Sequence, residues 1–125
     1  MPTPSDTHHQ GRVVAGTEDT ELAAADVTLG GAWGTSPSVA VAAGSKDHRG
    51  RITVTSGSGT PGANPTVTVT FKRAFASAPF VVVSKGDTGA GTWVVTSRST
   101  TAFTATFVGT PAASTAYVLD YICEE

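Results

Sequence analysis

The sequence is poor in charge and has a single cysteine. Charged residues make up only 14% of its 125 residues, the formal net charge is −2, and no run of Lys or Arg occurs. We expect no nucleic-acid partner, because binding to phosphates requires several cations on one face. Cys123 is the only cysteine, so no disulfide can form within the chain. With no histidine near it in sequence, Cys123 is interpreted as a small buried or end-strand thiol.

Long apolar runs are also missing. No stretch of 18 apolar residues occurs, so we expect no membrane-spanning helix and no membrane partner. The N-terminal residues, MPTPSDTHHQGR, lack the basic start and the apolar core of a signal peptide. These absences predict a protein that is made in the cytoplasm and kept there until it joins a partner.

What the sequence does contain is typical of a turn-rich β protein. It has 14 glycines and 7 prolines, with abundant Thr, Ser, Val and Ala. In the stretch 51–71, RITVTSGSGTPGANPTVTVTF, apolar residues alternate with threonines at both ends, which is the period of a strand. The middle holds three glycines and two prolines, so the chain must turn there, and a hairpin loop is expected.

The same loop matches the letters of a phosphate-binding motif. Gly57, Gly59 and Gly62 fit G-x-G-x-x-G, which binds a dinucleotide when its last glycine opens a helix. Here a proline and another β-patterned segment follow, and the acidic residue expected about 20 positions later is missing. We therefore predict no cofactor.

The β pattern begins after residue 37 and predicts seven strands bounded by clusters of Gly, Pro, Ser or Thr. Spacings of roughly 10 to 15 residues leave no room for crossover helices and favour antiparallel sheets. The expected fold is all-β, an antiparallel β-sandwich over residues 32–125 preceded by an N-terminal arm over residues 1–31 that is partly disordered when free. The predicted strands are 38–43, 50–56, 65–72, 79–85, 91–98, 101–108 and 115–123.

The last two predicted strands place aromatic residues on one face. Phe103, Ala105 and Phe107 share a face, as do Tyr117, Leu119 and Tyr121, and these rings should dominate the core. On the opposite face of the last strand, Asp120 lies between Val118 and Ile122. Its carboxylate is either solvated on an outer face or bonded to a partner across a subunit boundary.

The predicted strand 79–85 is apolar on both faces, at Phe80, Val81, Val82 and Val83. This pattern is typical of a central strand covered on each side. One cover would be the opposing sheet, and the other a further layer such as a second subunit.

Few residues fit a catalytic site. Lys46, Asp47, His48 and Arg49 form the densest ionisable cluster, and a solvated hairpin tip is favoured there over a partner contact or an Asp47–His48 catalytic pair. His8, His9 and Asp6 lack the spacing and support of a metal site. The sequence also has no G-x-S-x-G motif. We predict no enzyme activity and no bound metal.

The remaining candidates for binding are aromatic or lie in the arm. Trp93 is expected to fill a core or an interface, with a stacking platform for a sugar as the alternative. Trp33, flanked by glycines, is expected to be exposed and to anchor an interface. The stretch 13–29 fits either a short helix capped by Thr17 or Thr20 or an extended segment that docks on a neighbour. The predicted partner-binding residues are Val13, Val14, Leu22, Val27, Leu29 and Trp33.

The order of residues is similar to a known family. From AWGTSPSVAVAAGS through GRITVTSGSGTPGANPTVTVTFKRAFASAPFVVVS to FTATFVGTPAASTAYVLDYI, the sequence resembles a β-sandwich domain of tailed-phage virion proteins. That family includes capsid decoration proteins, head fibres and tail-fibre tips. The resemblance covers roughly residues 32–123 and rests on turn and core residues, which indicate fold better than activity. The matching positions are Gly50, Ile52, Val54, Gly57, Pro65, Phe71, Ala76, Ala78 and Pro79, followed by Phe103, Phe107, Ala113, Thr115, Tyr117 and Tyr121.

The resemblance implies a structural protein of the virion's outer surface that assembles as a homotrimer. A small domain with an arm, lacking a coiled coil or collagen-like repeat, looks more like a capsid decoration (cement) protein than a fibre tip. The expected partner is then the major capsid protein of the head shell. The alternative is a tail-fibre or head-fibre tip that binds a host-surface glycan through loops 57–65 and 86–92 with Trp93 or Trp33.

Overall fold

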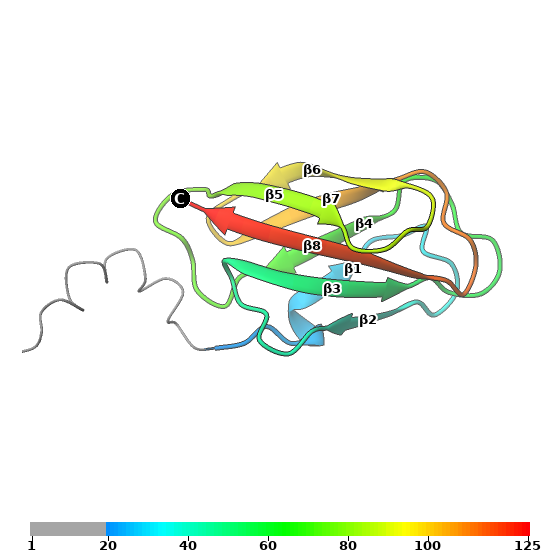
Figure 1. The fold of residues 1–125 in the computed structure, drawn as a ribbon, viewed down its shortest axis with the longest axis horizontal. Coiled ribbons are helices and arrows are strands. Elements are labelled where there is room, and N and C mark those ends of the chain that lie inside the picture. Colours follow the sequence, from blue (N-terminus) through cyan, green and yellow to red (C-terminus); the bar gives the residue numbers. More distant parts are fainter. Residues whose placement is uncertain (1–19) are drawn as a thin grey trace, which may run out of the picture.

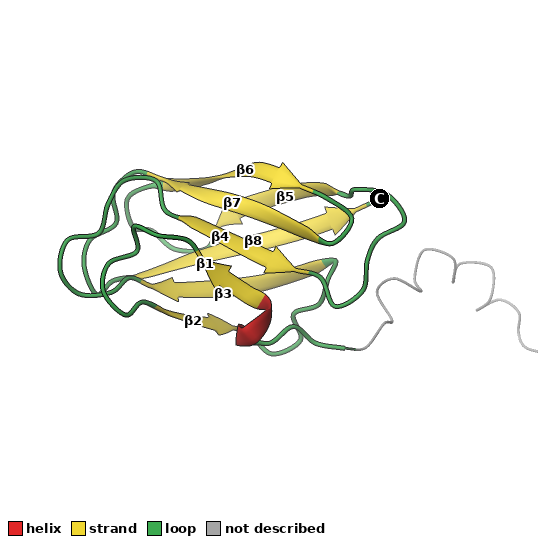
Figure 2. Cartoon of the chain, turned by 180° about the vertical axis from the view of Figure 1, so that it is seen from behind, coloured by secondary structure: helices red, strands yellow, loops and turns green. Residues whose placement is uncertain are grey.

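The computed structural model describes residues 20–125 and shows two four-stranded antiparallel sheets packed as a sandwich (Figures 1 and 2). The predicted antiparallel β-sandwich is therefore confirmed. One short 3₁₀ helix, η1, precedes the strands. In chain order the elements are η1 (Ala24–Asp26), β1 (Val27–Leu29), β2 (Ser38–Val41), β3 (Arg49–Thr55), β4 (Thr66–Thr70), β5 (Phe80–Lys85), β6 (Thr92–Arg98), β7 (Ala102–Val108) and β8 (Ala116–Glu124).

The first sheet has the strand order β1-β4-β7-β6, and the second has the order β2-β3-β8-β5. All neighbouring strands are antiparallel. Only β2–β3 and β6–β7 are both consecutive in the chain and paired, so the other connections cross between the sheets. Strands β5 and β6 are the edge strands on the same side of the sandwich and lie side by side there (Figure 1).

Alternation of apolar and hydroxyl residues explains why the strands form. In β4, Val67 and Val69 are fully buried, whereas Thr66, Thr68 and Thr70 lie on the outer face. Successive side chains of a strand point to opposite faces, so this pattern fits only one orientation. All seven predicted strands occur, and their ends differ from the predicted ones by two residues at most.

The sequence missed the first strand. β1 pairs with β4 in register from Val27 opposite Val69 to Leu29 opposite Val67. The amide of Leu22 also donates to the carbonyl of Ser45 at 2.9 Å. The predicted helix capped by Thr20 does not form, because the short η1 has Ala23 at its N-cap, and Thr17 lies outside the described residues. The strand β1 is extended, as the other predicted form requires. Residues 20–31 thus lie with the sandwich, which moves the boundary drawn after residue 31 toward the N-terminus.

The loop 57–65 is not a hairpin loop, because β3 and β4 belong to different sheets. It crosses the end of the sandwich and is fixed by backbone hydrogen bonds to the loop around Trp33. The amide of Gly57 donates a hydrogen bond to the carbonyl of Trp33 at 2.6 Å. Thr35 and Ser58 each donate a backbone hydrogen bond to the carbonyl of the other, at 2.9 and 3.0 Å. A Cβ atom at Gly57 would lie only 2.0 Å from the carbonyl oxygen of Thr35, so glycine is required for this close approach.

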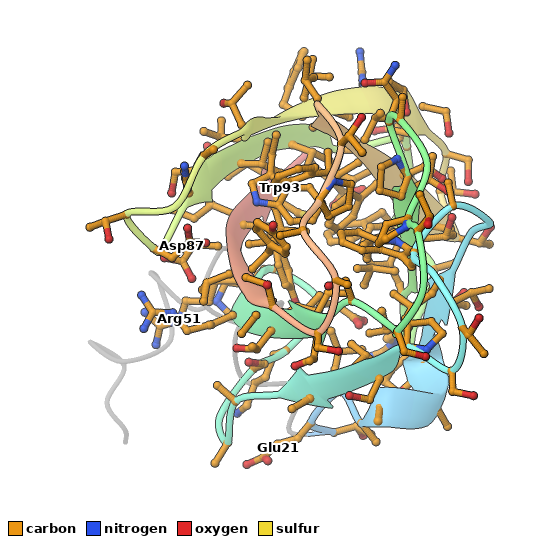
Figure 3. All side chains as sticks on the ribbon, turned by 90° about the vertical axis from the view of Figure 1, so that its right-hand side faces the viewer. Glu21, Arg51, Asp87 and Trp93 are labelled. Carbon is orange, nitrogen blue, oxygen red and sulfur yellow. The ribbon has the colours of Figure 1, made fainter. Side chains whose placement is uncertain are left out.

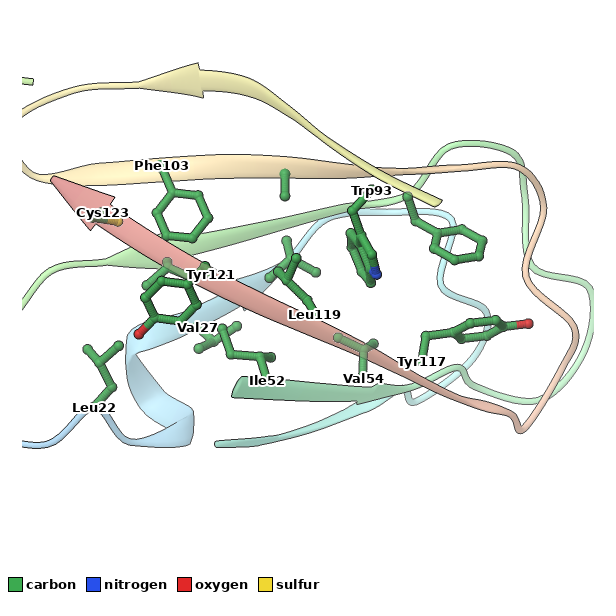
Figure 4. Close-up of a cluster of buried hydrophobic side chains, with 14 of the residues drawn as sticks. Leu22, Val27, Ile52, Val54, Trp93, Phe103, Tyr117, Leu119, Tyr121 and Cys123 are labelled. Atoms are coloured by element: carbon green, nitrogen blue, oxygen red, sulfur yellow. The ribbon is translucent and has the colours of Figure 1, made fainter. Parts of the chain in front are cut away.

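The hydrophobic core fills the space between the sheets (Figure 4). The two predicted aromatic faces of β7 and β8 are both buried, which confirms those predictions. The rings form two groups, one around Trp33 and one around Phe103. The buried apolar residues are Leu22, Val27, Trp33, Ile52, Val54, Val67, Val69, Phe71, Trp93, Phe103, Ala105, Phe107, Tyr117, Leu119, Tyr121 and Cys123.

Trp33 was predicted to be exposed, and that prediction is wrong, because its side chain is 0% exposed. Its indole lies within 6.2 Å, centroid to centroid, of Trp93, Phe107 and Tyr117. The indole Nε1 donates to the carbonyl oxygen of Thr66 at 2.8 Å, so its polar atom is satisfied inside the core. The flanking glycines let the loop turn back over the sandwich, and they do not indicate exposure.

The prediction that strand 79–85 is central is also wrong. β5 is an edge strand of the second sheet. Its inward residues Val81 and Val83 pack against the core, whereas Phe80 and Val82 point outward and are 67% and 64% exposed. The second apolar face is real, but no other part of the described chain buries it.

Replacing Trp33 with alanine tests its place in the core. We expect Trp33→Ala to lower the free energy of unfolding by about 3–5 kcal/mol, the usual cost of deleting a large buried aromatic side chain. Urea unfolding followed by circular dichroism measures this loss. Thr28→Ala, on an exposed strand position, is the control and should change stability by less than about 0.5 kcal/mol. A Trp33 variant as stable as this control would contradict the buried position.

Candidate interaction surface

Three aspartate side chains hold the backbone of loops. Asp47 accepts hydrogen bonds from the amides of Lys72 and Arg73 at 2.7 and 3.0 Å. Asp87 accepts from the amides of Val118 at 2.7 Å and Gly89 at 2.8 Å. A carboxylate that accepts amide hydrogens at both oxygens is held in one place and fastens two segments together.

Asp26, the residue before β1, also holds two segments together, here with one amide and one ammonium group as donors. It accepts from the amide of Ala23 at 2.9 Å and pairs with the ammonium of Lys72 at 3.0 Å. The backbone hydrogen bond, with the nearby Lys72, lowers the pKa of the Asp26 carboxyl. These contacts tie the segment before β1 to the loop after β4.

Asp120 has a charged partner within the chain, and a contact across a subunit boundary stays a prediction. Its carboxylate forms a bidentate ion pair with Arg51 on the neighbouring strand β3. The Nε and Nη2 atoms of Arg51 donate to the two carboxylate oxygens at 2.7 and 2.9 Å. The two residues are direct cross-strand partners. Because both side chains are partly exposed, the pair orders the outer face more than it stabilises the fold.

The cluster at residues 46–49 lies at the predicted hairpin turn between β2 and β3, but it is not a solvated tip, because residues 46–48 are half-buried. Lys46 and Arg49 exchange backbone hydrogen bonds of 2.8 and 3.2 Å across this tight turn. The carboxylate of Asp47 points to the loop after β4, where it accepts hydrogen bonds from the amides of Lys72 and Arg73. Both oxygens of Asp47 therefore accept hydrogen bonds from backbone amides. In a catalytic pair the carboxylate would instead accept a hydrogen bond from the His48 imidazole and orient it.

His48 lies over the end of the last strand. Its carbonyl accepts from the amide of Cys123 at 2.8 Å, and the Tyr121 hydroxyl donates to the carbonyl of Lys46 at 2.6 Å. The Nδ1 atom of His48 is buried and has no hydrogen-bond partner among the described residues. Burial, with the positive charges of Arg49 and Lys46, lowers the pKa of the imidazole.

Cys123 is buried on β8, as the sequence predicted. Burial raises the pKa of its thiol to about 12. Since only the thiolate is a good nucleophile, this thiol is unreactive near neutral pH.

The loop end of the sandwich offers no tryptophan platform for a sugar ring. Trp93 is 7% exposed, points inward between the sheets (Figure 3), and donates from Nε1 to the carbonyl of Val118 at 3.2 Å. This confirms the interpretation of Trp93 as a core residue. With Trp33 buried too, stacking of a glycan on either indole would require the core to open. Asp87, at the same end, is occupied by backbone amides.

Threonines line the outer face of the first sheet along β1, β4 and the middle of β7. Strands β1, β4 and β7 carry no charged residue. Hydroxyl groups bond across neighbouring strands, as between Thr68 and Thr104 at 2.9 Å and between Thr96 and Thr106 at 3.0 Å. We call this surface the threonine face, formed by Thr28, Thr66, Thr68, Thr70, Thr104 and Thr106. It is neutral, and part of its hydrogen-bonding capacity is satisfied within the sheet.

A second distinctive surface is apolar. Five large hydrophobic residues are exposed among residues 20–125, and all of them lie on β5, β6, β7 and β8. They lie on the edge strands β5 and β6, which are next to each other (Figure 1), and on the strands β8 and β7 that pair with them. We call this surface the apolar side, formed by Phe80, Val82, Val94, Val108 and Ile122. The sequence signal for it was the unbroken apolar run in β5, which was attributed to a central strand.

The predicted partner-binding residues do not form one surface. Leu22, Val27 and Trp33 are buried in the core, and Leu29 packs partly against it. Val13 and Val14 lie outside the described residues, as do His8, His9 and Asp6. Partner contacts by these residues stay a prediction, and the three buried side chains would have to leave the core to make them.

Within residues 20–125 no three His, Cys, Asp or Glu side chains gather as metal ligands would. No helix in that range is both long and apolar enough to cross a membrane. Comparison with family models, curated proteins and solved structures finds no match for this chain.

The lowered pKa of His48 predicts how stability depends on pH. The folded state holds a proton on this imidazole less tightly than the unfolded chain, whose ordinary pKa is 6.5. As the pH falls through 6.5, the unfolded chain takes up the proton first, so the free energy of unfolding should decrease. Urea unfolding between about pH 8 and about pH 5.5 measures this decrease, which should be smaller in His48→Gln. An NMR titration placing the His48 pKa above 6.5 would contradict the prediction.

Proposed function

We propose that the chain is a non-enzymatic structural protein of a bacteriophage virion, a capsid decoration protein that binds the major capsid protein on the outer surface of the head as a symmetric oligomer. The observation that carries the proposal is the sequence pattern over roughly residues 32–123, which resembles the sandwich domain of phage virion proteins. The antiparallel β-sandwich is the fold that this pattern requires.

The side-chain chemistry supports a role in contact more than in reaction. The aspartates at positions 26, 47 and 87 fasten backbone segments, and Asp120 pairs with Arg51. The one cysteine has a raised pKa. A decoration protein needs no reacting group. It stabilises a shell by burying area across several subunits, where specific interfaces bury about 1,200–2,000 Å² in total.

Neutral outer faces also suit such a role. The strands of the threonine face present methyl and hydroxyl groups without a charged residue on β1, β4 or β7. Burying this face costs no desolvation of an ion, and hydroxyl groups can exchange their bonds to water for bonds to a partner. Symmetry then repeats the same contact for each subunit, which strengthens attachment to a shell.

The alternative, a fibre tip that binds a host-surface glycan, lacks such support. It relied on Trp33 or Trp93 as an exposed platform, and both indoles are buried. A glycan array with the purified chain tests this alternative separately. Specific sugar binding without attachment to heads would favour it over the decoration protein.

Attachment to heads tests the proposal directly. Heads of the phage that encodes the chain, prepared without it, should bind the purified protein at a fixed ratio to the major capsid protein. Cosedimentation measures the ratio, and the decorated heads should withstand a higher temperature than bare heads. A protein that stays in the supernatant at every concentration would refute the proposal.

A truncation tests the contribution of residues 1–19. Within residues 20–125 the buried apolar residues run from Leu22 to Cys123 and form one cluster, so we expect the deletion variant to melt within a few degrees of the full chain. We expect it to bind heads more weakly, because Val13 and Val14 would no longer add a strand or an apolar contact to a neighbour. Undiminished binding would show that the head contact lies wholly on the sandwich.

A further inference from the structure

The exposed hydrophobic residues are concentrated on one side of the molecule. Among residues 20–125, all five of them lie on β5 to β8 and none on β1 to β4. Scattered exposed apolar residues need no explanation, but a cluster of several on a small domain often marks an interface. The side where β5 meets β6 is visible at the top of Figure 1, away from β1 and β2.

Three of these residues form a continuous group on the second sheet. Val82 is the direct cross-strand partner of Ile122, and Phe80 occupies the next outward position along β5. Their exposed fractions are 67% for Phe80, 64% for Val82 and 54% for Ile122. The guanidinium of Arg98 lies 5.2 Å from the centroid of the Phe80 ring, so the ring is held in place at the surface.

The other two exposed hydrophobic residues lie on the first sheet. Val94 on β6 and Val108 on β7 are 45% and 44% exposed and lie on the outer face of the first sheet. The edge strands here are also the long ones, since β5 and β6 have six and seven residues, against three in β1 and four in β2. Long edge strands that carry exposed apolar residues are the ones that associate unless they are covered.

We propose that the apolar side is buried against a second copy of this chain. This inference rests on the symmetric oligomer of the proposed function and names the surface that forms it. Charge is the first argument for a second copy. On the second sheet Arg49 is the cross-strand partner of Ile122, and Glu124 is the cross-strand partner of Phe80. The apolar group therefore has a positive residue, Arg49, on one margin and a negative residue, Glu124, on another. Two copies can place these opposite charges next to each other across their contact.

Area and symmetry give the second argument. A stable interface needs roughly 800 Å² from each partner, which is more than one group of three side chains supplies. The apolar side extends over the outer faces of both sheets, so one copy can present its β5–β8 part to the β6–β7 part of the next. Such a head-to-tail contact repeats from copy to copy, and it gives a symmetric ring where the rotation between copies closes.

Sedimentation of the full chain and one double variant tests the inference. We expect the wild-type protein to sediment as a multiple of its 12.6 kDa mass. Val82→Glu/Ile122→Glu should sediment as the monomer, because two carboxylates would have to lose their water to be buried in the contact. The matched control is Ala40→Glu/Thr53→Glu, a cross-strand pair on the far part of the same sheet, which should associate like wild type. A monomeric wild-type chain, or an associated Val82/Ile122 variant, would overturn the inference.

Thiol labelling separates a second copy from a cover supplied by the same chain. In Val82→Cys, labelling by a maleimide should slow as the protein concentration rises, whereas Ala40→Cys should react at one rate throughout. The native Cys123 is buried and does not compete. Slow labelling that is independent of concentration would place the cover within the chain and overturn the inference, as would fast labelling at all concentrations.

Head binding keeps this inference distinct from the proposed function. Monomers that decorate heads would refute the interface and leave the decoration role standing. Oligomers that depend on Val82 and Ile122 and fail to bind heads would do the reverse.

Discussion

The structure depends on the burial of one indole between the two sheets. Trp33 reaches the core from the loop after β1, contacts rings of β6, β7 and β8, and donates its Nε1 hydrogen to the carbonyl of Thr66 at the start of β4. It therefore joins strands of both sheets at the end where the chain crosses between them. The same loop pairs through its backbone with Gly57 and Ser58, so packing and hydrogen bonding hold this end together.

Scarce charges are used to fasten loops. Asp47 holds the loop after β4, and Asp87 holds the loop after β5 against the amide of Val118. Each contact replaces water around a carboxylate with fixed amide donors, which is favourable because the ionised form accepts strong hydrogen bonds. The result is a rigid sandwich with a neutral threonine face and an apolar side. Such surfaces suit lasting contact with other proteins, as the proposed role requires.

Sequence reasoning was reliable where the signal was local. Apolar segments bounded by clusters of Gly, Pro, Ser or Thr located seven strands. The alternation in β7 and β8 identified six of the sixteen buried apolar residues. Prediction from the sequence failed where the residue types next to a position suggested a different environment from the one in the fold. Glycines around Trp33 suggested exposure, although they serve a turn that brings the indole inward. The apolar run of β5 suggested a central strand, although the strand lies at an edge with one face uncovered. The short β1 has too few residues to show a period.

Strand positions and the inward and outward faces of most strands can be predicted from the sequence, because a side-chain period of two is a property of each segment alone. The folded structure was needed for the order of strands in each sheet, for the partners of Asp47, Asp87 and Asp120, and for the burial of Trp33. These features join residues distant along the chain, and many pairings satisfy the same local pattern. The order of strands decides which strands lie at the edges, and therefore where the apolar side lies. No pattern within a single segment of the sequence contains this information.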